Sequence, residues 1–190
     1  MIARRRTLVL GGVRSGKSRW AERQLAGEAR VVYLATADER DDAEWAERIA
    51  AHQRRRPPHW STEQTLDVAG WLSAPRNPLL VEDLGNWLAR TIDGTAGWNG
   101  ELASYRTRAA ELVTAWQHCP GRVVLVSNEV GSGIHPESRA ARMFADELGS
   151  LNTALAAVAD EVVLVVAGLP LWLRRPAENC LPAEEAGEQP

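Results

Sequence analysis

Lysine is almost absent from this chain. The 190 residues include 22 lysine and arginine side chains together, and Lys17 is the sole lysine. Where a positive charge alone is wanted, the sequence uses arginine. Position 17 therefore requires the compact ammonium group on a flexible stem that distinguishes lysine from the planar guanidinium group.

Cysteines and long hydrophobic runs are also scarce. Cys119 and Cys180 form no C-x-x-C pair, and no secretory hydrophobic segment lies near Met1, so we expect a protein of the reducing cytoplasm. Apolar stretches such as VVLVVAGLPLWL, residues 162–173, contain Gly and Pro and fall short of the ~20 residues that span a bilayer. This predicts no membrane insertion.

The charge balance argues against a nucleic-acid partner. The net charge is −3, and the run of three arginines at 54–56 is too short to form a basic stripe. The hydrophobic content of 45% is typical of a folded chain. Residues 1–175 fit one domain in length. Residues 176–190 hold four glutamates, three prolines and no aromatic residue, which predicts a disordered acidic tail.

Apolar runs alternate with helical segments along the chain. The order predicts an α/β protein with a mainly parallel sheet and helices on both faces. The expected strands are 7–12, 29–37, 78–88, 121–130 and 160–173, with a further strand beyond Gly168. The expected helices are 18–27, 41–56, about 101–118 and about 137–158.

A glycine-rich loop separates the first strand from the first helix. Gly11-x-x-x-x-Gly16-Lys17-Ser18 matches the Walker A pattern of P-loop proteins in full. Backbone N–H groups of such a loop converge on a phosphate group. Lys17 then reaches the β- and γ-phosphates, and the Ser18 hydroxyl binds Mg²⁺. The predicted phosphate-binding residues are Gly11, Gly12, Val13, Arg14, Ser15, Gly16, Lys17 and Ser18.

The third predicted strand supplies two acids for the same site. Glu82 and Asp83 stand where LLVED ends, and a Walker-type Mg²⁺ site needs a carboxylate at the end of a neighbouring strand. Either residue fits, and each could instead cap a helix. The base of the nucleotide is not identified. A guanine-specific N-K-x-D box is missing, and SNEV at 127–130 does not replace it, which argues against a regulatory GTPase.

Over residues 7–173 the chain resembles the bifunctional cobinamide kinase/cobinamide-phosphate guanylyltransferase family of cobalamin biosynthesis. The resemblance is carried by GGVRSGKSRWAE (11–22), YLATA (33–37), residues 41–64, LLVEDLGNWL (79–88) and residues 123–173. The last segment is the most specific. It runs V-S-N-E-V-G-x-G-I-x-P-E-x-R-x-A-R-x-F and continues into a G-x-x-N-x-x-L-A helix.

This resemblance implies a RecA-like P-loop NTPase fold and two Mg²⁺-dependent reactions. The first phosphorylates the aminopropanol hydroxyl of adenosylcobinamide with ATP or GTP. The second transfers GMP from GTP to that phosphate through a guanylyl-histidine, giving adenosylcobinamide-GDP. The family also implies a homo-oligomer in which neighbouring chains build the corrinoid site.

The resemblance places the guanylylated histidine at His52. Arg54, Arg55 and Arg56 follow one turn later and would neutralise the triphosphate. We expect Ser18 and Glu82 to hold Mg²⁺, with Asp83 as the other candidate carboxylate. The nucleotide contacts that we predict beyond the P-loop are Ala35, Thr36, Ala37, Gln53, Arg54, Arg55, Arg56, Glu63 and Glu82. Among them, Glu63 and Glu82 fall on positions that resemble the family's nucleotide contacts.

The chain has four histidines. His59 follows two prolines and is the second candidate for the nucleophile. His118 suits a helix C-terminal cap, and His135 lies in a loop where it could line the corrinoid site.

The chain also departs from the family pattern in places. The family tends to have a small or sulfur-containing residue after the glutamate and a threonine two places further on, whereas this chain has Asp83 and Gly85-Asn86. Two other functions stay open at this point. One is a P-loop small-molecule kinase without guanylyl transfer. The other is a nucleotide-driven conformational switch, which would need no histidine beside the nucleotide.

Overall fold

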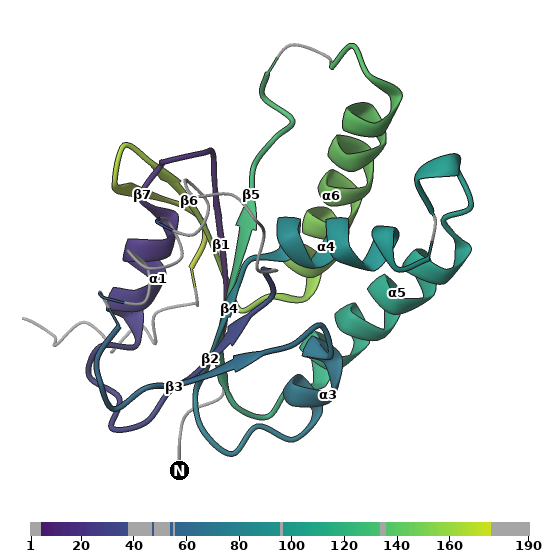
Figure 1. Cartoon of the computed structure of the whole chain (residues 1–190). Coiled ribbons are helices and arrows are strands. Elements are labelled where there is room, and N and C mark those ends of the chain that lie inside the picture. Colours follow the sequence, from purple (N-terminus) through teal and green to yellow (C-terminus); the bar gives the residue numbers. More distant parts are fainter. Residues whose placement is uncertain are drawn as a thin grey trace, which may run out of the picture.

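A seven-stranded sheet forms the centre of the protein (Figure 1). The computed structural model describes residues 5–37, 47, 54, 56–95, 97–133 and 136–175. The sheet order is β3-β2-β4-β5-β1-β6-β7. The strands are β1 (Arg5–Gly11), β2 (Val32–Ala35), β3 (Ser61–Gln64), β4 (Leu79–Glu82), β5 (Arg122–Asn128), β6 (Glu161–Val166) and β7 (Leu169–Arg174). Only β7 pairs antiparallel within this described part, so the predicted mainly parallel sheet is confirmed.

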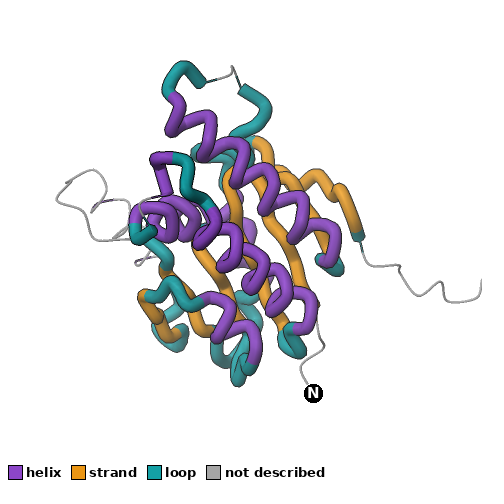
Figure 2. Tube along the Cα trace, turned by 90° about the vertical axis from the view of Figure 1, so that its right-hand side faces the viewer, coloured by secondary structure: helices purple, strands orange, loops and turns teal. Residues whose placement is uncertain are grey.

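Helices cover both faces of the sheet, as predicted. One face carries α1 (Lys17–Gln24), and Figure 2 shows the helices of the other face lying in front of the strands. Those helices are α3 (Val68–Ser73), α4 (Leu84–Asp93), α5 (Ala103–His118) and α6 (Arg139–Val158), with a short 3-10 helix η1 (Gly97–Asn99) between α4 and α5. Alternate strand residues divide between the two cores: Val9 packs on the α1 side, and Leu8 and Leu10 pack on the other.

Strand register brings the carboxyl ends of the central strands to one edge. Gly11 pairs with Asn128, and Ala35 pairs with both Glu82 and Gln64. Side chains and loops that follow these residues therefore gather at the same end of the sheet, which is where open α/β sheets bind ligands.

The predicted strand 78–88 is wrong in its second half. β4 ends at Glu82, and α4 begins at Leu84. Asp83 ends the strand because its Oδ1 accepts a hydrogen bond from Asn86 N at 2.8 Å and so caps the helix. Leu84, Leu88 and Ile92 are then buried at helical spacing.

Besides α4, the sequence analysis missed α3, β3 and the short helix η1. All four residues of β3 are exposed and polar, so no hydrophobic run marks this edge strand. It forms because its backbone pairs with β2. Most of the predicted helix 41–56 and the whole predicted tail 176–190 lie outside the described residues. In the part of the chain described, no helix is long and apolar enough to cross a membrane.

Candidate functional site

The glycine-rich loop folds tightly between β1 and α1. Arg14 and Gly16 adopt left-handed backbone conformations, with φ of 57° and 90°. Gly11 is required by space, since a Cβ atom there would lie 2.4 Å from Ser15 Oγ and 2.8 Å from Val165 O. The loop opens onto the N-terminus of α1, where the Gly16 cap has no side chain to occupy the first N–H groups. This geometry suits an anion.

The β6–β7 turn supports the loop from the side. Gly168 N donates to Ser15 O at 2.7 Å. A Cβ atom on Gly16 would lie only 3.0 Å from Gly168 Cα, so both backbones approach closely. The loop conformation thus depends on a hairpin more than 150 residues away in sequence.

Lys17 and Ser18 meet Glu82 at the end of β4. Lys17 is 8% exposed, and its Nζ lies 3.4 Å from Gly12 O. Ser18 Oγ donates to Glu82 Oε1 at 2.5 Å. Glu82 Oε2 is buried and has no hydrogen-bond partner among the described residues. The structure therefore brings together the lysine, the hydroxyl and one of the two acids expected from the sequence.

The electrostatics of Glu82 fit a residue that faces a cation. Burial raises its pKa to about 8, and the negative charge of Asp83 acts in the same direction. The hydrogen bond from Ser18 and the charge of Lys17 lower it. A buried carboxylate oxygen without a partner, next to a hydroxyl, matches the donor set of a Mg²⁺ site that is completed by phosphate oxygens and water.

Asp83 points elsewhere. Its Oδ2 accepts from Asn86 Nδ2 at 3.2 Å, in addition to the bond from Asn86 N to Oδ1. Asn128 Nδ2 lies 3.4 Å from Oδ1. Burial also raises the pKa of Asp83. The two neighbouring acids thus occupy different surroundings, and Glu82 is the one that contacts Ser18.

The segment after β2 contacts both acids through backbone groups. Thr36 Oγ1 donates to Asp83 O at 2.6 Å, and Thr36 N donates to Glu82 O at 3.0 Å. Arg90 of α4 donates to Thr36 O at 2.9 Å. Of the predicted nucleotide contacts, Ala35, Thr36 and Ala37 lie at this edge of the sheet, whereas Glu63 is exposed on β3, two strands away from β4.

Arg56 is held over an aromatic ring. Its guanidinium carbon lies 3.3 Å from the centre of the Tyr33 ring, and its Nη1 donates to Thr62 Oγ1 at 2.9 Å. A cation stacked on a buried ring is fixed in place. Arg54 is exposed. His52, Gln53 and Arg55, which the sequence analysis assigned to nucleotide binding or catalysis, lie outside the described residues.

Among the described residues, His59 and His118 make no hydrogen bond to the P-loop. His59 is an exposed turn residue. His118 is the last residue of α5, and its Nδ1 lies 2.9 Å from Thr114 O, in agreement with the expected cap. His135 lies outside the described residues.

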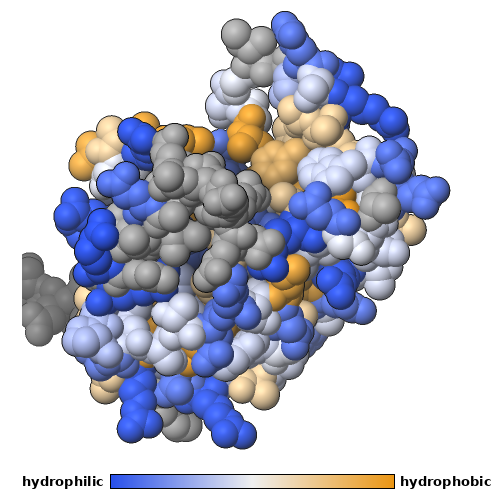
Figure 3. Space-filling model, viewed as in Figure 1, coloured by the Kyte–Doolittle hydropathy of each residue, from blue (hydrophilic) through white to orange (hydrophobic). Residues whose placement is uncertain are grey.

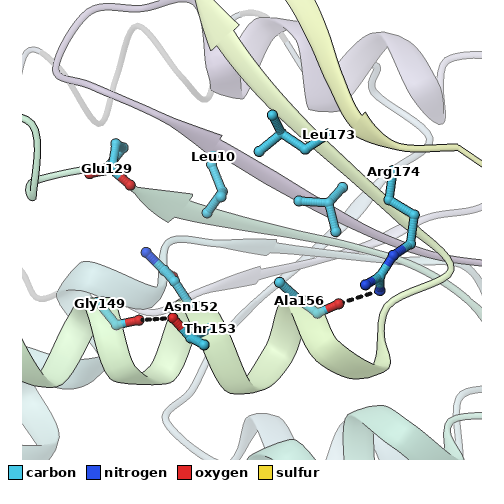
Figure 4. A pocket seen from close by; sticks show the side chains of 9 residues that line it. Leu10, Glu129, Gly149, Asn152, Thr153, Ala156, Leu173 and Arg174 are labelled. Carbon is cyan, nitrogen blue, oxygen red and sulfur yellow. Dashed lines mark hydrogen bonds between the residues drawn. The ribbon is translucent and has the colours of Figure 1, made fainter.

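A recess of about 360 Å³ lies beyond the loop, between α6 and strands β1, β6 and β7 (Figure 4). Its walls combine apolar and polar side chains, and none of the predicted nucleotide contacts lines it. The lining residues are Leu10, Glu129, Gly149, Asn152, Thr153, Ala156, Val162, Leu173 and Arg174. Arg174 donates to the carbonyl oxygens of Ala156 and Ala159 at 2.5 and 3.0 Å, and so closes the end of α6.

Sequence reasoning missed the polar network behind the site. Ser127, Asn128 and Asn152 stand in the V-S-N-E and G-x-x-N parts of the most specific segment, but no role followed from their spacing. The structure shows them hydrogen bonded to one another and to Asp83.

A strand, a glycine-rich loop, a helix that begins with lysine and serine, and a strand-end carboxylate define a P-loop nucleotide-binding protein. A solved structure of an ATPase from the type III secretion system of pathogenic bacteria shares this fold. Its TM-score is 0.53, with 11% identity over 88% of this chain and 56% of that chain. This confirms the predicted RecA-like P-loop fold.

The chain belongs to the cobinamide kinase / cobinamide phosphate guanyltransferase family, whose model matches residues 7–173. It is similar to the bifunctional adenosylcobalamin biosynthesis protein CobU of Salmonella typhimurium, with 43% identity over 181 residues, 88% of this chain and 98% of the relative. It is also similar to the bifunctional protein CobP of Pseudomonas aeruginosa, with 42% identity over 177 residues, 89% of this chain and 97% of the relative. The family predicted from the sequence is confirmed.

Proposed function

We propose that this protein phosphorylates the aminopropanol hydroxyl of adenosylcobinamide with ATP or GTP and then transfers GMP from GTP to the new phosphate. The observation that carries the proposal is the convergence of Lys17, Ser18 and Glu82 at the P-loop of a chain that belongs to this family. Membership of this family favours a protein with both kinase and guanylyltransferase activity over a kinase without guanylyl transfer and over a nucleotide-driven conformational switch.

In the first reaction the substrate hydroxyl oxygen attacks the γ-phosphorus and the bond to the β-phosphate oxygen breaks. The hydroxyl proton leaves with water, and the nucleoside diphosphate is released. Loop N–H groups and Lys17 bind the β- and γ-phosphates and stabilise the charge that develops on them. Ser18 and Glu82 would hold Mg²⁺, which supplies further positive charge to the same oxygens.

In the second reaction a nitrogen of His52 attacks the α-phosphorus of GTP, and pyrophosphate leaves. An oxygen of the corrinoid phosphate then attacks the same phosphorus, the phosphorus–nitrogen bond breaks, and adenosylcobinamide-GDP is formed. A neutral imidazole is needed, and an ordinary histidine pKa of ~6.5 provides it near neutral pH. Arg56, anchored on Tyr33, would stabilise the departing pyrophosphate.

Incubation with GTP labelled in the α-phosphate, followed by denaturation, tests the covalent step. We expect the label to stay on the protein, to be lost in His52→Ala and to persist in His59→Ala. Kinase turnover of His52→Ala should remain substantial, because γ-phosphoryl transfer needs no covalent intermediate. Label that persists on His52→Ala, or that disappears in His59→Ala, would contradict the assignment. Wild-type protein that phosphorylates the corrinoid but takes no label would favour the plain kinase.

We also propose that the protein acts in the cytoplasm, where its nucleotide substrates are made, and as a homo-oligomer. Exposed apolar side chains gather on the β6–β7 hairpin, at the upper left of Figure 3. Val166, Leu169, Leu171 and Leu173 are each more than half exposed, and such patches mark interfaces. Leu171→Asp should lower the mass in sedimentation, whereas the control Thr107→Asp on α5 should not. An unchanged mass in Leu171→Asp would exclude this edge as the interface.

A further inference from the structure

The Asn128 side chain fills a space beside the strand-end acids that exists because residue 85 is glycine. A Cβ atom at position 85 would lie 2.4 Å from Asn128 Nδ2 and 3.2 Å from Asp83 Oδ1. Asn128 Nδ2 itself lies 3.4 Å from Asp83 Oδ1. Gly85 therefore leaves room for a direct contact between the end of β5 and the first residue after β4.

The far side of Asn128 is held by α6. Asn152 Nδ2 donates to Asn128 O at 3.1 Å, and Asn152 Oδ1 accepts from Ser127 Oγ at 2.6 Å. Figure 4 shows Asn152 extending from α6 toward the sheet. Ser127 is fully buried and Asn152 is nearly so, and a satisfied buried network of this kind is rigid. Since Asn128 also pairs with Gly11 across the sheet, its position is fixed relative to the P-loop.

The contact engages a carboxylate that stands next to Glu82 in sequence. Asp83 accepts hydrogen bonds from Asn86 of α4 and is approached by Asn128 at the end of β5. Glu82 faces Ser18 instead. Mg²⁺ takes carboxylate oxygens in a strict geometry. If the Asp83 carboxylate were released from these hydrogen bonds, it would change both the charge and the set of ligands at the metal.

We propose that Asn128 is a positioning residue. In the space left by Gly85 it keeps the Asp83 carboxylate turned toward α4, so that Glu82 alone serves the metal–nucleotide site beside Ser18. This inference rests on the proposed function in one respect, the assignment of Ser18 and Glu82 to the metal. Asn128 itself touches neither Ser18 nor Glu82 in any hydrogen bond of the described chain.

The test is the dissociation constant of Mn²⁺ in the GTP complex, measured by electron paramagnetic resonance. Asn128→Leu keeps the branched shape and the number of side-chain heavy atoms and removes the donor. We expect Mn²⁺ to bind about fivefold more tightly, because one freed charge a few ångströms away then acts on the cation. In an Asp83→Ser background, which retains a capping oxygen, the same change should have no effect. Damage to packing alone would weaken Mn²⁺ binding in both backgrounds.

Gly85→Ala gives an independent route, because the added Cβ atom displaces the end of Asn128 without changing its chemistry. It should tighten Mn²⁺ binding as Asn128→Leu does. Gly149→Ala on α6 is the matched control, since a Cβ atom there meets nothing within 4 Å. If Asn128→Leu fails to fold, Gly85→Ala decides the question.

Unchanged or weaker Mn²⁺ binding in the folded Gly85→Ala protein, or an equal tightening with and without Asp83, would overturn the proposal. Failure of the proposed function would show differently. The unaltered protein would then bind Mn²⁺ with GTP and yet phosphorylate no adenosylcobinamide.

Discussion

At the scale of single residues, the identity of Lys17 carries the most information. The chain uses arginine for every other strong positive charge. In the structure the Lys17 side chain is buried beneath the loop. A Cβ atom added to Gly11 would lie 3.3 Å from the Cβ atom of Lys17. A guanidinium group is larger and needs a planar set of acceptors. The buried position of residue 17 under the loop thus suits the compact ammonium group of lysine.

Lys17→Ala should abolish both activities while the fold stays intact. Loss of a cation that stabilises the transition state costs about 10²-fold or more in rate. Steady-state kinase turnover and GMP labelling measure the loss, and circular dichroism checks the fold. Lys17→Arg is the matched control for charge, and we expect it to stay at least tenfold impaired. Near-normal turnover of Lys17→Ala with the corrinoid would contradict the role of the loop.

Glu82→Ala should need far more Mg²⁺ for half-maximal kinase activity than Asp83→Ala. The reason is that Glu82 contacts Ser18, whereas Asp83 caps α4. Asp83→Ala should instead lower the free energy of unfolding by ~1 kcal/mol through loss of the cap. Magnesium titrations and urea denaturation separate the two effects. A larger metal requirement in Asp83→Ala would mean that Asp83 is the ligand.

The raised pKa of Glu82 predicts a pH-dependent stability without ligand. Its folded pKa of about 8 lies above the ordinary value of 4.5, so the folded state binds the proton more tightly than the unfolded state. This contribution is complete below pH 4.5 and is lost as the pH rises toward 8. Glu82→Gln should therefore raise the melting temperature at pH 8 and change it little at pH 4.5. An equal difference at both pH values would argue against this assignment.

At the scale of elements, the sequence predicted the strands that continuous hydrophobic runs mark. Leu8, Val9 and Leu10, or Val123 to Val126, are buried on both faces and read as central strands. The boundary at Asp83 was missed because Leu84, Trp87 and Leu88 continue the apolar composition of β4 into α4. β3 was missed because its stability comes from backbone pairing with β2 and not from burial.

The candidate site was predictable where one motif encodes it. Lys17 and Ser18 follow from the Walker A spacing, whereas the choice between Glu82 and Asp83 needed the hydrogen bond from Ser18. Asn128 and Asn152 escaped because their contacts join β5, α6 and the start of α4, and no spacing along the chain encodes such a meeting.

The β6–β7 turn is the element on which the loop rests, and Gly168 is its critical residue. Gly168 has φ of 80°, so Gly168→Ala should cost ~1 kcal/mol of stability and disturb the bond to Ser15 O. We expect several-fold weaker GTP binding by calorimetry. Gly27→Ala is the control, because an added Cβ atom there meets nothing within 4 Å. Unchanged GTP binding in Gly168→Ala would show that the loop holds its shape without the hairpin.

At the scale of the whole molecule, a sheet of seven strands with helices on both faces leaves one edge strand, β7, with exposed leucines. The other edge, β3, is polar. Edges of these two kinds behave differently, because polar edges resist association and apolar ones favour it. The asymmetry directs any pairing between copies to the β7 side.

Deletion of residues 176–190 should leave activity and melting temperature nearly unchanged. The composition of this segment, with four glutamates and three prolines, predicts little apolar burial to offset the entropy of ordering. Differential scanning calorimetry and the two activity assays compare the shortened and full chains. A marked loss in either property would mean that the tail binds to the folded protein or to a neighbouring copy.

Because the sole lysine lies beneath the P-loop, cleavage by a lysine-specific protease can report on the opening of this loop. A lysine-specific endoprotease has one bond to cut in this sequence, Lys17–Ser18. This bond lies in the first turn of α1, and the Lys17 side chain is 8% exposed. Cleavage therefore requires the loop to open locally or the protein to unfold. The rate at which the 17-residue fragment is released reports that opening directly, and nucleotide occupancy becomes readable as protection on a gel.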